Sequence, residues 1–154
     1  MARQVVPRIS SEHTRDKILS ASAVFARLEQ AKPNNYGRTK SEMQSTFSAI
    51  LLKLANRVPQ DVDLLFHFCY GDLGHRHVVE PSDMSDMVDL ANSLSHELSR
   101  PVQLIHMPVP RGRTDDAYFE PLKRLALDET LICLGLVHFT DGVDGSRKRC
   151  ETPK

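Results

Sequence analysis

The sequence has few cysteines and no long apolar segment. These two features argue against a disulfide-rich domain and against a membrane-spanning helix. Its three cysteines, Cys69, Cys133 and Cys150, are odd in number and irregularly spaced, so they do not form the framework of a small disulfide-rich domain. No run approaches the roughly 20 apolar residues of a membrane-spanning helix, and none resembles the apolar part of a signal peptide. We therefore expect a cytoplasmic protein with no membrane partner.

An excess of charge of either sign is also missing. Twenty basic residues balance twenty acidic residues, so there is no surplus of positive charge to bind a phosphate backbone. We expect no nucleic-acid partner. What is present is ordinary for one globular domain, because 154 residues with 40% hydrophobic side chains can bury a core of their own.

The first sixty residues carry the periodicity of helices. Between residues 12 and 30, apolar side chains recur at helical spacing, at Ile18, Ala21, Phe25 and Leu28. The turn-forming stretch 33–37 interrupts this pattern, and a second amphipathic helix is predicted over residues 41–57. We therefore divide the chain into an N-terminal helical segment, residues 1–38, and a β/α domain, residues 39–154.

Beyond residue 60, three short apolar runs alternate with helical patterns. The runs span residues 62–69, 102–107 and 131–138, and they are apolar on both faces, as buried parallel strands are. Helices are predicted between them, at residues 82–98 and 116–126. This alternation predicts an α/β protein whose three strands are parallel and adjacent in chain order.

Each apolar run carries, at its end or next to it, a side chain that can act as a ligand or a base. His67 and Cys69 close the first run, His106 the second and His138 the third. In β/α folds the chemistry collects at the carboxyl ends of the strands, where the loops converge. His67 and Cys69 are two residues apart, so they project from one strand face and can serve together as two zinc ligands.

Two ligands are only half of a tetrahedral site, and a second interpretation stays open on these residues alone. A strand cysteine is commonly a small core residue, and a histidine at a strand end is commonly held by hydrogen bonds. Cys133 and Cys150 are interpreted as structural and incidental, respectively.

A series of motifs in the same region resembles one known family. The motifs are His67-Phe-Cys69-Tyr-Gly-Asp72, Gly74-His-Arg-His77 with Glu80-Pro81, His106-Met-Pro-Val-Pro-Arg111, Asp115-Asp-Ala-Tyr-Phe119 and Gly135-Leu-Val-His-Phe-Thr-Asp-Gly142. Together they resemble the cobalamin-independent methionine synthase-like proteins, which belong to the TIM-barrel superfamily shared with uroporphyrinogen decarboxylase. The resemblance covers about residues 40–150, and the combination is more specific than any single motif.

The resemblance implies a barrel, but the sequence offers only part of one. A complete barrel has eight βα units in about 250 residues, so three clear strands correspond to a partial (β/α) TIM-barrel-like unit. Three explanations stay open: a shortened product without activity, a half-barrel that pairs with itself or with another chain, and a remodelled domain whose amphipathic N-terminal helices cover the exposed face. We expect a homo-oligomer or a complementing chain unless the first sixty residues fold back over the sheet.

The resemblance also implies zinc as cofactor. Methionine synthases of this type bind zinc through a His-x-Cys pair on one strand, which His67 and Cys69 match. They use a Glu on the next strand, where this sequence has approximately His106, so the third ligand is changed. Their last ligand is a cysteine on a strand that would lie beyond Thr152.

The implied activity is methyltransferase-like chemistry on a small-molecule substrate, in a specialised biosynthetic pathway. Zinc would bind a substrate thiol and lower its pKa. The candidate catalytic residues are His106, His138 and Asp141. The candidate substrate-binding residues are Tyr70, Asp72, His75, His77, Arg111 and Arg147. The two arginines can clamp a carboxylate or a phosphate, and they are equally compatible with surface charges. The alternative is a non-catalytic remnant or interaction module that lacks a complete metal site.

Overall fold

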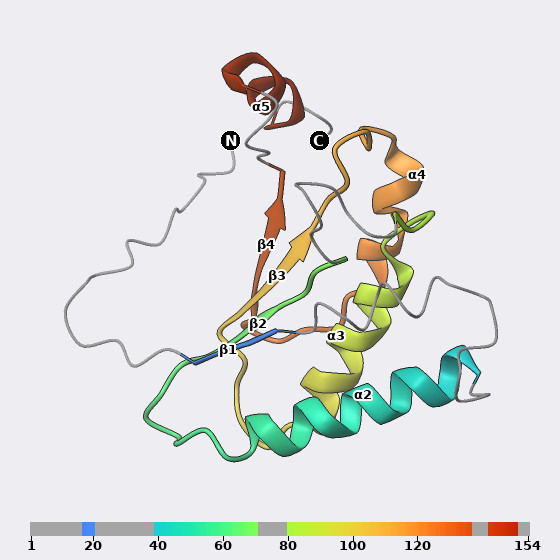
Figure 1. Cartoon of the computed structure of the whole chain (residues 1–154). Coiled ribbons are helices and arrows are strands. Elements are labelled where there is room, and N and C mark those ends of the chain that lie inside the picture. The colour runs from blue at the N-terminus through green and yellow to red at the C-terminus, as the bar shows by residue number, and fades with distance from the viewer. Residues whose placement is uncertain (1–16, 21–38, 71–79, 137–141, 151–154) are drawn as a thin grey trace.

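The computed structural model shows a parallel sheet with helices along one face (Figure 1). The structure describes residues 17–20, 39–70, 80–136 and 142–150. Within them four strands pair in parallel, in the order in which they occur along the chain. They are β1 (Lys17–Ser20), β2 (Leu64–His67), β3 (Leu104–Pro108) and β4 (Leu131–Gly135). The prediction of an α/β protein with three adjacent parallel strands is confirmed by β2, β3 and β4.

The prediction of a helix over residues 12–30 is wrong at residues 17–20, which form strand β1. Residues 17–20 are extended and pair with β2 along its whole length, from Lys17 opposite Leu64 to Ser20 opposite His67. A short apolar run such as Ile18-Leu19 fits a helix and a strand equally well, and here the pairing with the edge of β2 decides between them. The remainder of that expected helix lies outside the described residues.

The predicted helices that follow are confirmed within two or three residues at each end. They are α2 (Lys40–Ala55), α3 (Ser85–Glu97) and α4 (Asp116–Phe119), which continues as a 3₁₀ helix, η1 (Glu120–Arg124). A further helix, α5 (Gly142–Cys150), follows β4. Helix α2 begins with a capping box, in which the Glu42 amide donates to Thr39 Oγ1 and the Thr39 amide donates to Glu42 Oε2. Among the described residues, no helix is both long and apolar enough to cross a membrane.

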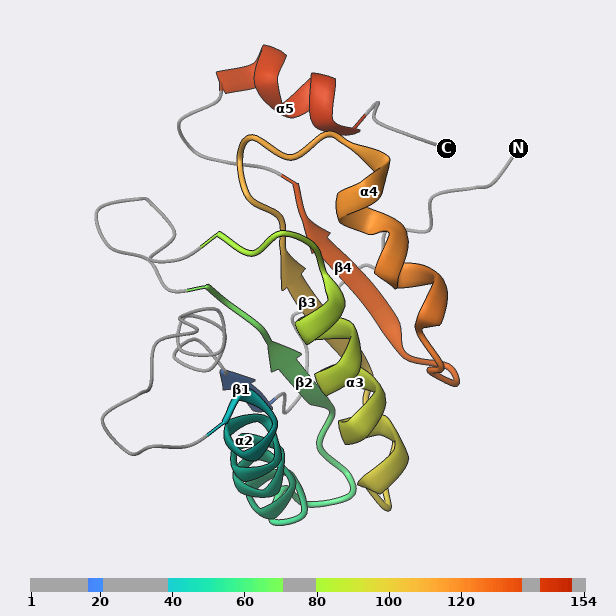
Figure 2. The same ribbon diagram turned by 90° about the vertical axis from the view of Figure 1, so that its right-hand side faces the viewer.

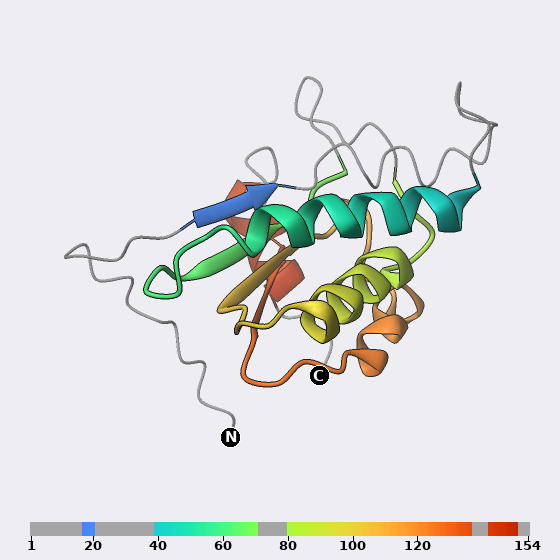
Figure 3. The ribbon, with the colours of Figure 1, turned by 90° about the horizontal axis from the view of Figure 1, so that it is seen from below.

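The core lies between the sheet and the helices α2, α3 and α4, which all lie on the same face of the sheet (Figures 2 and 3). Alternate residues of the strands point into it. Leu64, Phe66 and Phe68 from β2 and its extension are fully buried, as are Ile105 and Met107 from β3. The residues between them, such as His67 and His106, therefore project from the opposite face.

A buried arginine binds the loop that leads into β2, at the amino-terminal end of the sheet. Arg100 is 6% exposed, and its guanidinium donates to the carbonyl oxygens of Val58 and Pro59 at 2.7 and 2.9 Å and to that of Val62. The loop after α2 is thus tied to the loop after α3. Because β2 begins two residues beyond Val62, the hydrogen bonds of Arg100 also fix the point at which β2 enters the sheet.

Candidate functional site

The strand pairing aligns three residues with ligand-type side chains in one row across the sheet. His67 on β2 is opposite His106 on β3, and His106 is opposite Cys133 on β4. Directly paired residues of parallel strands project from the same face. The row therefore lies on the face opposite α2, α3 and α4, and close to the carboxyl ends of the strands.

The two histidines of the row are in ring contact. The centroids of the His67 and His106 rings are 4.7 Å apart, and the ring planes are inclined by only 18°. Burial lowers the pKa of His106 below its ordinary value of 6.5, and the neighbouring His67 lowers it further. Among the described residues, His106 Nδ1 has no hydrogen-bond partner although it is buried. The site thus contains an imidazole whose neutral form is favoured by burial and whose Nδ1 has no partner among the described residues.

Cys69 follows His67 by two residues and is half-buried beyond the end of β2. The alternation of buried residues along this stretch places both side chains on the face opposite the helices, as the sequence predicted. Within the described part of the chain, however, no three His, Cys, Asp or Glu side chains gather closely enough to hold one metal ion. His67 and Cys69 therefore provide two candidate zinc ligands, and the described residues do not complete a tetrahedral set.

Tyr70, a predicted substrate-binding residue, lies on the other face of the sheet. It is 1% exposed, and its hydroxyl is 3.4 Å from that of Tyr118 on α4. Burial raises the pKa of Tyr118 to about 12, and the Arg113 guanidinium lies 5.3 Å from the centre of its ring. The structure thus places Tyr70 in the core with Tyr118 and does not bring it together with His67 and Cys69.

The two candidate arginines are exposed and lie at the carboxyl side of the sheet. Arg111 follows β3 by three residues. Arg147 lies on α5, where its Nη1 is 3.8 Å from Asp144 Oδ1. Helix α5 lies beyond the carboxyl end of β4 (Figure 1). These positions are compatible with anion binding at the mouth of the site and with ordinary surface charges.

The other predicted site residues, Asp72, His75, His77, His138 and Asp141, lie outside the described residues. The third strand was expected to extend to His138, but β4 ends at Gly135. The Leu136 amide donates to the Leu134 carbonyl at 2.9 Å, a tight turn that ends the extended backbone there.

Cys133 is the residue that sequence reasoning missed, because it was interpreted as structural. It is exposed and paired with His106. A signal for it was present in the sequence. The runs Leu65-Phe-His67, Leu104-Ile-His106 and Leu131-Ile-Cys133 share one pattern of a leucine, an apolar residue and a ligand-type residue. The strand register aligns these three runs residue by residue.

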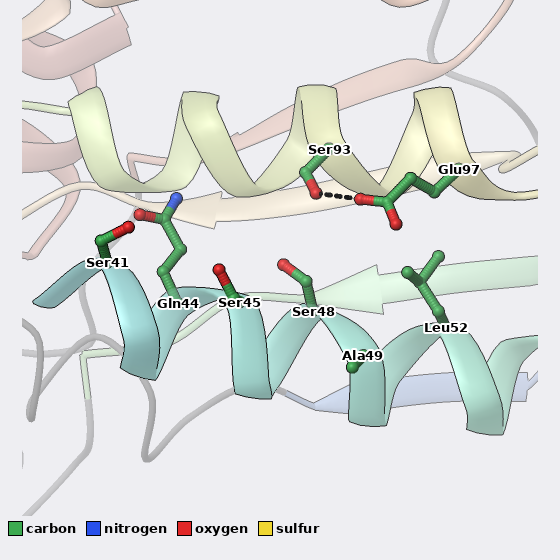
Figure 4. Close-up of a pocket in the computed structure, with 8 residues that line it drawn as sticks. All are labelled: Ser41, Gln44, Ser45, Ser48, Ala49, Leu52, Ser93 and Glu97. Carbon is green, nitrogen blue, oxygen red and sulfur yellow. Dashed lines mark hydrogen bonds between the residues drawn. The ribbon is translucent and has the colours of Figure 1, made fainter. Parts of the chain in front are cut away.

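A groove of about 430 Å³ lies elsewhere, between α2 and α3 (Figure 4). Its lining is mostly polar: Ser41, Gln44, Ser45, Ser48, Ala49, Leu52, Ser93 and Glu97. The Ser93 hydroxyl donates to Glu97 Oε1 at 2.7 Å across one helical turn of α3. None of the predicted site residues lines this groove, so it is separate from the row on the sheet.

Comparison of the chain with protein-family models, with curated proteins and with solved structures finds no match. The resemblance to the methionine synthase-like proteins therefore stays a prediction that rests on the motifs alone.

Proposed function

We propose that this protein is a methyltransferase-like enzyme that acts on a small molecule, with its site at the carboxyl ends of β2, β3 and β4. The observation that carries the proposal is the aligned row of His67, His106 and Cys133, with Cys69 on the same face. A single histidine or cysteine at one of these positions would be compatible with a structural role. Imidazoles and thiols on three neighbouring strands instead provide bases, nucleophiles and soft ligands at one place.

The arrangement of the sheet supports a partial barrel as the framework of this site. The strands follow one another in chain order, and the connecting helices α2, α3 and α4 lie on one face. In a (β/α) barrel all helices lie outside the strands in this way, whereas a doubly wound sheet has helices on both faces. The open face of the present sheet would then correspond to the barrel interior, and the row of ligand-type residues to its mouth.

Each residue of the site has a role in this proposal. His106, neutral and with a buried unpaired Nδ1, accepts a proton or donates a lone pair to a bound group. Arg111 and Arg147 offer guanidinium groups to an anionic part of the substrate. His67 and Cys69 are the candidate zinc ligands. Because the described residues do not complete a zinc site, we assign no step of the reaction to the metal. The proposal includes a cytoplasmic location, where thiols stay reduced.

The zinc content of the purified chain tests this proposal. We expect protein isolated without chelator to contain zinc in a fixed ratio to the chain, and His67→Ala to lose it. His96→Ala is the matched control, because His96 is an exposed histidine on α3, remote from the row. A wild-type chain that neither retains nor takes up zinc, and that methylates no thiol in the presence of a methyl donor, would contradict the proposal.

A second candidate function is an interaction module, and one observation favours it. On the face opposite the helices, Leu65, Leu104 and Leu131 are aligned across three strands, and Leu131 is 53% exposed. The partner would be a second copy of this chain, since two four-stranded units supply the eight strands of a barrel. Leu131→Lys then converts a dimer into monomers in light scattering. A wild-type chain that is monomeric at all concentrations excludes this candidate.

A further inference from the structure

Gly135, the last residue of β4, occupies a position where a side chain has no room. A Cβ atom at this residue would lie 2.9 Å from Nε2 and 3.2 Å from Cε1 of His106. It would also lie 3.4 Å from the Cα atom of Pro108, its partner on β3. The ring of His106 thus lies over the backbone of the next strand, in the space that any other residue would fill.

The backbone does not explain the glycine. Among the described glycines, only Gly142 has a φ in the left-handed region, so Gly135 adopts a conformation that other residues also adopt. Glycine within a strand destabilises the strand, because glycine loses more backbone conformational entropy on folding than other residues and contributes no side-chain contacts. The close approach of the His106 ring is the feature that requires glycine here.

His106 is consequently confined from two sides. Its ring stacks against His67 on β2 with a centroid distance of 4.7 Å, and it lies over Gly135 on β4. These two contacts span three strands and limit the directions that the ring can take, while Nδ1 has no hydrogen-bond partner among the described residues. Packing against His67 and Gly135 therefore acts on the orientation of this imidazole together with a hydrogen bond to the Phe68 backbone.

We propose that Gly135 is a positioning residue for His106: by leaving its own side-chain space empty, it lets the imidazole lie against His67 on the open face of the sheet. This inference rests on the proposed function only for the chemical use of His106. The placement of the ring is inferred from its contacts with His67 and Gly135 alone. A side chain at residue 135 displaces the end of the His106 side chain and not the backbone of the sheet. The substitution therefore disturbs the site while the fold is retained.

The test compares Gly135→Ala with Gly112→Ala. Gly112 is a matched control, because a Cβ atom there meets nothing within 4 Å and its φ lies outside the left-handed region. In chelator-treated protein with isotope-labelled histidine, nuclear Overhauser contacts between the ring protons of His67 and His106 report the stack. We expect Gly135→Ala to abolish or strongly weaken these contacts and Gly112→Ala to leave them unchanged. Unchanged ring contacts in Gly135→Ala would overturn the inference.

A double-variant cycle separates positioning from a general effect on the strand. In the wild-type background Gly135→Ala should lower the melting temperature. In a His106→Ala background it should leave the melting temperature unchanged or raise it, because the obstructing ring is gone and alanine suits a strand better than glycine. If Gly135→Ala fails to fold but the double variant folds, the inference holds. An equal loss of stability, or failure to fold, in both backgrounds would overturn it.

The outcome is independent of the metal part of the proposed function. Ring contacts are read without zinc, so a displaced ring in a chain that never binds zinc supports the role of Gly135 and contradicts only the zinc proposal. If the chain binds zinc but the His67–His106 stack is undisturbed in Gly135→Ala, the result supports the zinc proposal and contradicts the role of Gly135.

Discussion

The imidazole rings of His67 and His106 lie stacked at 4.7 Å on neighbouring strands, and they are directly paired in the sheet. Two imidazolium ions at this distance repel each other, and the partial burial of both rings weakens the screening by water. At least one ring is therefore kept neutral in the folded protein. Burial and the neighbouring His67 make His106 the ring with the lowered pKa.

This relationship predicts how stability depends on pH. Because the folded pKa of His106 lies below its ordinary value of 6.5, the unfolded chain binds more protons in the interval between the two values. In chelator-treated protein, the free energy of unfolding should fall as the pH is lowered through 6.5 towards the folded pKa. His106→Ala should reduce this pH dependence in urea unfolding, whereas His96→Ala should retain it. Identical pH profiles for the wild type and His106→Ala would show that the ring pair is not linked to folding.

Arg100 provides a prediction about the stability of the fold. Its guanidinium serves three backbone carbonyl groups of the loop before β2, so Arg100→Met leaves all three without this donor. We expect a loss of about 2–4 kcal/mol in the free energy of unfolding. Arg100→Lys should recover only part of it, because one ammonium group lacks the planar fork that reaches several acceptors. Arg57→Met, at an exposed arginine on the same loop, should change stability by about 0.5 kcal/mol or less.

The buried hydroxyl pair of Tyr70 and Tyr118 predicts a late step in a spectrophotometric tyrosine titration. The pKa of Tyr118 is raised to about 12, mainly by burial, so its contribution to stability is lost as the pH rises from its ordinary value of 10.0 towards 12. Tyr118→Phe should remove the late step and cost about 1 kcal/mol. Tyr70→Phe should move the step to higher pH, because the hydrogen bond from Tyr70 opposes the rise in the pKa of Tyr118. A late step that survives Tyr118→Phe would contradict this assignment.

The strands β2, β3 and β4 could be predicted because each is a separate apolar run, and the parallel order follows from the helical patterns between them. The face on which His67 and His106 lie could also be predicted, since the period of two along a strand fixes it once the buried residues are known. Burial of Phe66 and Ile105 against the helices then fixes the register that pairs the two histidines.

Other features depend on contacts between distant parts of the chain and could not be read from local patterns. Residues 17–20 form a strand only because the edge of β2 is available for pairing. Gly135 looks like a strand-weakening residue until the ring of His106, 29 positions earlier in the sequence, is placed over it. Cys133 is interpreted as structural from the sequence, whereas the strand register places it beside His106.

The last prediction concerns Cys69, the thiol of the candidate zinc pair. If it is a ligand, Cys69→Ser should abolish zinc binding, because serine does not supply the soft thiolate that zinc prefers. The fold should be retained with a loss of about 1 kcal/mol or less, since the substitution is nearly isosteric and Cys69 is only half-buried. Cys150→Ser, at an exposed thiol on α5, is the matched control and should leave zinc content unchanged. Cys133→Ser tests whether the thiol beside His106 contributes a further ligand. If Cys69→Ser unfolds the chain while zinc is absent before and after the substitution, Cys69 serves the packing of the sheet and the zinc proposal is wrong.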